Sequence, residues 1–134
     1  MKNSISHKIY NHLEFLGYKV EDVETKNDID MIIGKSEEKS NLILMILKGI
    51  IYITAQYIIG KEKDVDTKKL LIELNKVNSD SIITKWFYVK GDKGLVIKIC
   101  TSSFGYEKER FSKLLDRLEK EVTLAMPQFS KFVK

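Results

Sequence analysis

Apolar residues recur at intervals of three and four in three parts of the chain, a spacing typical of helices that bury one face. The first predicted helix covers about residues 4–16, and Gly17 follows it at the position where helices commonly end in a left-handed residue. The second begins after Asp66, a favourable N-cap because its carboxylate can accept from the free N–H groups of the first turn. Leu74 lies in the middle of its apolar stripe and should be buried.

The third predicted helix is the longest, and Ser102 or Ser103 is positioned to cap it. Its apolar stripe passes through Leu118, which should also be nearly inaccessible to solvent. Pro127 should end this helix, because proline lacks the backbone donor and clashes with the preceding turn.

A tail from about residue 127 follows the third helix and carries Phe129 and Phe132. Chain ends are usually poorly ordered. Bulky apolar side chains in this one predict instead that it docks, either on its own domain or on a second copy of the chain.

Between the helices the pattern changes to extended runs separated by polar turns. Strands are predicted at about residues 28–34, 41–48, 50–59, 82–89 and 95–101, with a possible further short strand or link at 19–23. The run LILMIL within 41–48 is too continuous for an exposed strand and favours one covered on both faces. The order α-β-β-β-α-β-β-α predicts an α+β fold in which helices pack on an antiparallel sheet of about five strands.

At 134 residues the chain has the length of one domain with its own core, so we expect a single domain over 1–134. No apolar run reaches the length of a membrane span, and the first residues lack the apolar core of a secretory signal. Cys100 is the only cysteine, which excludes an intrachain disulfide and favours a reducing cytoplasm. The sequence therefore predicts a cytoplasmic protein without a membrane segment.

The charge balance gives little support to nucleic acid as a partner. There are 23 basic and 19 acidic residues, but only Arg110 and Arg117 are arginines, the residue best suited to phosphates and base edges. A solvated lysine-rich surface explains the excess better. Trp86, Phe87 and neighbouring lysines could form a stacking surface for single strands, yet strand alternation must turn Trp86 or Phe87 into the core. A nucleic-acid-binding domain remains the alternative function.

A nuclease of the restriction-endonuclease type is a third, less favoured interpretation. Such enzymes place an acid on one strand and Glu-x-Lys on the next, so that carboxylates hold Mg²⁺. Asp30 and Lys48 copy this spacing, but Ile46 occupies the position of the second acid. Asp30 is better interpreted as an acid that pairs at a strand edge or turn.

The remaining reactive residue types also favour structural roles, so we expect no catalytic residue, cofactor or metal. His7 and His12 point in different directions on the first helix and cannot chelate one ion; both are interpreted as exposed. Cys100 lies among β-branched neighbours and is interpreted as a buried, inert thiol. Phosphate-loop and catalytic-triad motifs do not occur. Asn75 and Asn78, three residues apart at a helix end, should bond the following turn.

These motifs together carry a family resemblance. The Asn75–Asn78 signature, the aromatic strand Trp86-Phe87-Tyr88, the hairpin at 91–94 and the opening LEFLGYKVEDV resemble the YbjN-like family of small bacterial proteins. That family is structurally akin to type III secretion chaperones. The resemblance implies the α+β fold, a role other than catalysis and a tendency to dimerise, and it implies no substrate.

The sequence thus predicts a non-catalytic protein-binding or regulatory module, chaperone-like, that offers an apolar surface to an extended partner segment by strand addition or side-chain pockets. The chain carries more nonpolar surface than a small domain easily hides, which predicts a two-fold homodimer. The candidate partner or dimer contacts are Trp86, Tyr88, Phe129 and Phe132.

Overall fold

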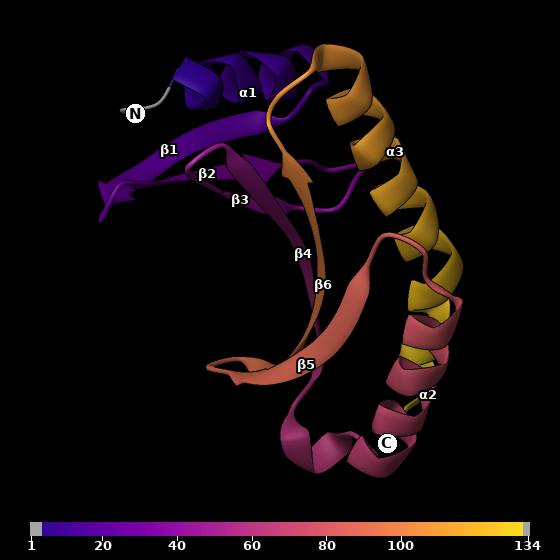
Figure 1. Cartoon of the computed structure of the whole chain (residues 1–134). Coiled ribbons are helices and arrows are strands. Elements are labelled where there is room, and N and C mark those ends of the chain that lie inside the picture. The colour runs from indigo at the N-terminus through magenta and orange to yellow at the C-terminus, as the bar shows by residue number, and fades with distance from the viewer. Residues whose placement is uncertain (1–3, 133–134) are drawn as a thin grey trace.

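The computed structural model describes residues 4–132, without the side chains of residues 4, 22–24 and 130 (Figure 1). Its helices are α1 (Ser4–Phe15), α2 (Thr67–Asp80) and α3 (Lys108–Ala125), with 3₁₀ turns η1 (Glu62–Asp64) and η2 (Met126–Phe132). Its strands are β1 (Lys19–Lys26), β2 (Ile29–Lys35), β3 (Leu42–Leu47), β4 (Ile50–Gly60), β5 (Lys85–Gly91) and β6 (Gly94–Phe104).

The strands form one antiparallel six-stranded sheet in the order β1-β2-β3-β4-β6-β5, which confirms the α+β prediction. The possible short strand near Val20 is a full edge strand, β1, which pairs with β2 along its length. Its composition hid it, because most of its residues are charged. Charged side chains are common on edge strands, where they discourage further pairing.

All three helices cover the same face of the sheet. In Figure 1 the sheet is strongly curved, and α1, α3 and α2 lie on the outer side of the curve. Alternate strand residues point toward them: Asp30 on β2 accepts a hydrogen bond from Ser6 of α1, and Trp86 on β5 stacks on Phe129 of η2. We call this side the covered face.

The core lies between the covered face and the helices. Leu74 on α2 is 3 % exposed and Leu118 on α3 is 1 % exposed, so both predicted core positions are confirmed. Ile32, Leu44 and Ile53 follow one another across β2, β3 and β4 and are fully buried. One continuous apolar core thus joins all the helices to the sheet.

Two local predictions at helix ends are confirmed and one is wrong. Gly17 ends α1 with φ +94°, and Asp66 caps α2 by accepting from the Lys69 backbone N–H at 3.2 Å. The cap of α3 is Glu107, because β6 continues through Ser102 and Ser103 to Phe104. Cross-strand pairing with β4 holds both serines in extended geometry.

The segment after Pro127 docks on its own domain as the 3₁₀ turn η2. Phe129 is fully buried, and its ring stacks on Trp86 with centroids 5.5 Å apart. The backbone carbonyl of Phe132 accepts from the Asp66 N–H at 2.9 Å, which ties η2 to the start of α2.

This docking corrects two of the predicted partner contacts. Trp86 is 2 % exposed and Phe129 is fully buried, so neither offers a surface to another chain. Tyr88 and Phe132 remain partly exposed, and their contact role stays a prediction. Among the described residues, no helix has the length and apolar character needed to cross a membrane.

Candidate functional site

The face of the sheet opposite the helices carries a continuous cluster of apolar side chains. We call this cluster the apolar patch; it consists of Met31, Ile33, Ile43, Met45, Leu47, Ile50, Tyr52 and Phe104. The register sets these residues side by side, since Met45 lies between Met31 and Tyr52, and Ile50 lies opposite Phe104. No described helix packs on this face.

The patch corrects the prediction that the LILMIL strand is covered on both faces. Leu42, Leu44 and Ile46 are buried beneath the helices, whereas Ile43, Met45 and Leu47 are only half-buried. The helices that would cover the second side do not exist in the described chain. The uninterrupted apolar run in β3 therefore indicates that its open side is an apolar surface, and not that a second layer of helices covers that side.

Exposure within the patch increases toward the β4–β6 end. Phe104 is 78 % exposed and Tyr52 is 42 % exposed, while the others shield one another. Met31 and Met45 are adjacent, and methionine adapts its shape to different partners. Exposed apolar clusters of this kind commonly mark contact surfaces.

Charged groups lie beside the patch on both sides. Lys98 on β6 and Lys85 on β5 point to the same face, and neither forms an ion pair with a described residue. On the opposite side Lys35 pairs with Glu21 at 3.5 Å. The surface is thus an apolar centre with a polar rim, the usual anatomy of a protein–protein contact.

The two edges of the sheet are poorly suited to strand addition. The β1 edge is interrupted by a bulge between Asp22 and Glu24. On the β5 edge, the Asn78 side chain donates to the Trp86 carbonyl at 2.8 Å and accepts from the Trp86 N–H at 2.7 Å. These two hydrogen bonds confirm that Asn78 has a structural role. They also occupy the Trp86 backbone groups with which an added strand would have to pair. The accessible apolar groups of the sheet therefore lie on its open face and not along its edges.

Asp30 lies on an interior strand and not at a strand edge, but it pairs with Thr25 across the β1–β2 turn, which confirms the second half of the prediction. It is 1 % exposed on the covered face and accepts from Ser6 at 2.6 Å and from Thr25 at 2.5 Å. Ile46 lies directly opposite it and is fully buried, while Lys48 stands in the following turn. The hydrogen bond from Ser6 attaches α1 to the sheet. The position where a nuclease would need its second metal-binding carboxylate is occupied by the apolar Ile46.

His12 is buried, which overturns its interpretation as an exposed residue. Its Nδ1 lies 2.8 Å from the Tyr106 hydroxyl and its Nε2 lies 2.9 Å from the Ser112 hydroxyl, so the ring links α1 to α3. Burial, and then the positive charge of Lys108, lower the pKa of His12. Its spacing from Ile9 already placed it on the apolar stripe of the helix. His7 is exposed, as predicted.

Cys100 lies on the same face as the apolar patch and is half-buried, so the prediction of a buried thiol is wrong. Its Sγ is 3.4 Å from the Thr54 hydroxyl on the neighbouring strand. Among the side chains that the structure describes, no three histidine, cysteine or acidic groups lie closely enough together to hold a metal ion.

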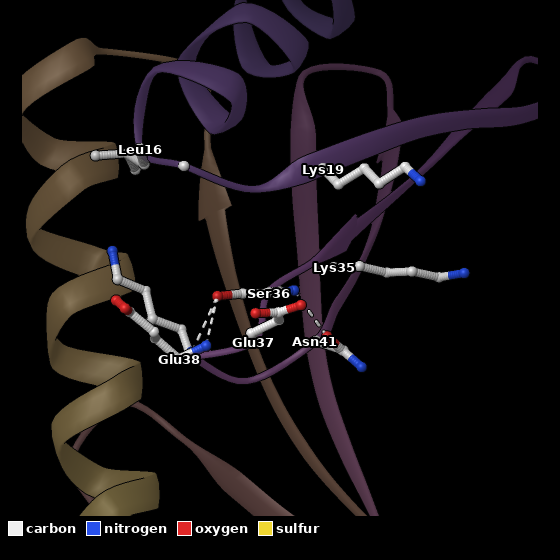
Figure 2. Close-up of a pocket in the computed structure, with 9 residues that line it drawn as sticks. Leu16, Lys19, Lys35, Ser36, Glu37, Glu38 and Asn41 are labelled. Carbon is white, nitrogen blue, oxygen red and sulfur yellow. Dashed lines mark hydrogen bonds between the residues drawn. The ribbon is translucent and has the colours of Figure 1, made fainter.

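A cleft of about 620 Å³ lies between the end of α1 and the β2–β3 loop (Figure 2). Its polar groups mainly hold the loop: Ser36 Oγ accepts from the backbone of Glu38 and Lys39, and Ser36 N donates to Asn41. Figure 2 shows Leu16 directed toward α3, while Lys19 and Lys35 extend the opposite way. The charges are mixed and do not converge on one point.

The protein thus belongs to the α+β class, with three helices backing one face of an antiparallel sheet. Two solved structures share this fold. YbjN from E. coli, described as a proposed transcription regulator, is 15 % identical and superposes with a TM-score of 0.67 over 90 % of this chain and 87 % of that chain. The resemblance to YbjN is thus confirmed at the level of the fold.

The second is an uncharacterised protein from Methanothermobacter thermautotrophicus. It is 12 % identical, with a TM-score of 0.71 over 97 % of this chain and 99 % of that chain. No protein-family model matches the sequence, and no curated protein matches it significantly. At these identities the likeness establishes the fold alone.

Proposed function

We propose that the protein is a non-catalytic protein-binding module with a regulatory role, and that the apolar patch is its contact surface. The observation that carries this proposal is the contrast between the two sides of the sheet. Three helices cover one side, while eight contiguous apolar residues on the other have no described partner. Burying such a surface against another chain is favourable by about 25 cal/mol for each Å² of apolar area.

The reactive side chains support a role other than catalysis. Asp30 and His12 would be the first candidates for acid–base chemistry, and both are buried and bonded to neighbours in the core. Cys100 is accessible but has no histidine beside it on the sheet. A regulatory role by protein contact agrees with the description of YbjN as a proposed transcription regulator.

We further propose that the first occupant of the patch is a second copy of the chain, giving a two-fold homodimer. A two-fold contact needs a surface that can meet itself. An apolar patch with both signs of charge beside it, Lys98 and the Glu21–Lys35 pair, meets that requirement. In this proposal Phe104 and Tyr52, which are exposed, replace the buried Trp86 and Phe129 as the residues that contact the second copy.

Site-directed photo-cross-linking in the expressing cell tests the proposal. A benzophenone amino acid replaces Phe104 in one variant and Ile82 in another, because these side chains are almost equally exposed, at 78 % and 76 %. We expect the probe at position 104 to yield a defined adduct with a second copy or with another protein. The probe at 82 should yield none.

Equal cross-linking from both positions would contradict the assignment of the patch. An adduct with nucleic acid at either position, weakened steeply by salt, would favour the alternative of a lysine-rich nucleic-acid-binding domain.

A further inference from the structure

A second pocket adjoins the first cleft on the helix side of the sheet, sharing Leu16 and Lys39 with it, and lies between α3 and the segment that joins α1 to β1. Its volume is about 460 Å³, within the range of small-molecule sites. Leu16, Leu115 and Leu124 form much of its wall, and Tyr18 lies beside them. None of these residues belongs to the apolar patch, so this pocket is independent of the proposed contact surface.

Tyr18 is held firmly in this pocket. Its backbone N–H donates to the Leu13 carbonyl at 3.0 Å, and its ring packs over Gly34, where an added Cβ would come within 3.3 Å of the ring. The Lys39 ammonium lies 5.6 Å from the ring centroid. Gly34 therefore provides the space that the ring occupies, and the hydroxyl has a fixed position.

The hydroxyl of Tyr18 is the one that no described residue satisfies in this region. The residue is only 6 % exposed, and its hydroxyl has no hydrogen-bond partner among the described side chains, although it is not one of their fully buried atoms. The neighbouring polar groups are paired: the Tyr57 and Ser40 hydroxyls bond each other, and Ser40 donates to Glu119. The buried side-chain atom without a partner among the described residues is Glu121 Oε2, so the Tyr18 hydroxyl keeps access to the open pocket that it lines. Solvent can serve this hydroxyl when the pocket is open, and a bound molecule would replace that water.

The protonation state and the surrounding charges define what the hydroxyl would bind. Burial, and then the negative charges near it beginning with Glu119, raise the pKa of Tyr18 to about 12. The phenol therefore remains a donor at neutral pH. Glu119 and Asp116 oppose an anionic acceptor, while Lys39 and Lys120 oppose a cation. The four charges balance.

We propose that this pocket binds a small uncharged molecule with an apolar body about the size of one ring and a carbonyl-type acceptor that receives the Tyr18 hydroxyl. The leucine side chains would enclose the ring, and the acceptor would lie toward Tyr18. Such a site would make the protein responsive to a ligand.

Three probes of one shape and different charge test the proposal: benzamide, benzoate and benzamidine. Each is titrated into the full chain, and backbone amide shifts are followed by NMR. We expect benzamide to saturate shifts at Leu16, Tyr18 and Leu115, and both ions to bind more weakly. Tyr18→Phe should weaken benzamide binding roughly three- to tenfold, the worth of one hydrogen bond. Tyr52→Phe, on the other face, should not change it.

Thr123→Trp provides an independent check, because Thr123 is exposed at the pocket wall and a tryptophan there would fill it without disturbing the core. This variant should abolish the benzamide shifts. The proposal is overturned if benzamide gives no saturable shifts around Tyr18. Equal binding of all three probes, or unchanged benzamide binding in both pocket variants, would overturn it as well.

Discussion

The two faces of the sheet are built from the same kinds of residue and differ in what covers them. Along β3, alternate residues are both aliphatic: Leu44 is fully buried beneath the helices, whereas Met45 next to it is half-buried on the open side. Hydrophobicity alone does not distinguish them. The difference arises because all three helices pack on one side, so one face stabilises the fold and the other is free for contacts.

The largest effect should come from removing a ring from the covered side. Phe129→Ala removes a fully buried ring from its stack with Trp86, and should cost about 3–5 kcal/mol of unfolding free energy. Phe104→Ala, on the open face, should change it by less than about 0.5 kcal/mol in a monomer. Denaturant unfolding at low protein concentration measures both. Equal losses would contradict the distinction between the faces.

The same contrast should hold within single helices, with a slightly smaller effect. Leu74→Ala or Leu118→Ala should cost about 2–5 kcal/mol, because each leaves a cavity in the core. Leu71→Ala is the matched control on α2, since that side chain is 49 % exposed, and it should cost less than about 1 kcal/mol. Urea titrations compare the three. A loss below about 0.5 kcal/mol at both core sites would mean that the helix faces are assigned wrongly.

A pH-dependent effect is expected at the α1–α3 junction. Because the pKa of His12 is lowered in the folded state from an ordinary value of 6.5, the unfolded chain binds the proton more readily. This contribution to stability is complete above pH 6.5 and declines as the pH falls from there toward the folded pKa. The slope should not exceed about 1.4 kcal/mol per pH unit. His12→Gln should flatten the profile between pH 5 and 7, whereas His7→Gln, at an exposed position, should leave it unchanged.

The smallest expected effect is none at all. Mg²⁺ or Mn²⁺ should not induce cleavage of DNA or RNA, because Asp30 is buried against Ser6 and Thr25 and faces Ile46. Incubation of plasmid and RNA with either metal measures this. Metal-dependent nicking that disappears in Asp30→Asn would contradict the assignment of Asp30 to the covered face as a structural group.

The sequence was sufficient wherever a local pattern determines structure. Helical spacing located Leu74 and Leu118, and the positions of Gly17 and Asp66 predicted the ends of two helices. A structural role for Asn78 also followed from its place at a helix end, although its partner is Trp86 on β5 and not the turn that follows the helix. These features depend on neighbours within a few residues, which the sequence displays directly.

The sequence failed where distant segments meet. Strand alternation required Trp86 or Phe87 to face the core, and the tail was expected to dock, but no local pattern shows that η2 folds back over β5 and stacks Phe129 on Trp86. The LILMIL run was assigned two covered faces because its spacing says nothing about how many helices are available. The Tyr18 pocket was missed for the same reason, since α3 and the α1–β1 link are far apart in the chain.

The most direct test of the account measures molecular mass by light scattering across micromolar concentrations. The wild-type chain should approach the mass of two 15.6 kDa copies as concentration rises, and Tyr52→Ser/Phe104→Ser should remain at the mass of one with its unfolding free energy unchanged at low concentration. Ile72→Ser/Ile82→Ser, which removes side chains elsewhere that are 61 % and 76 % exposed, should behave as the wild type. Dimers that persist in Tyr52→Ser/Phe104→Ser, or dissociate equally in both double variants, would contradict the claim that the open face of the sheet is the contact surface.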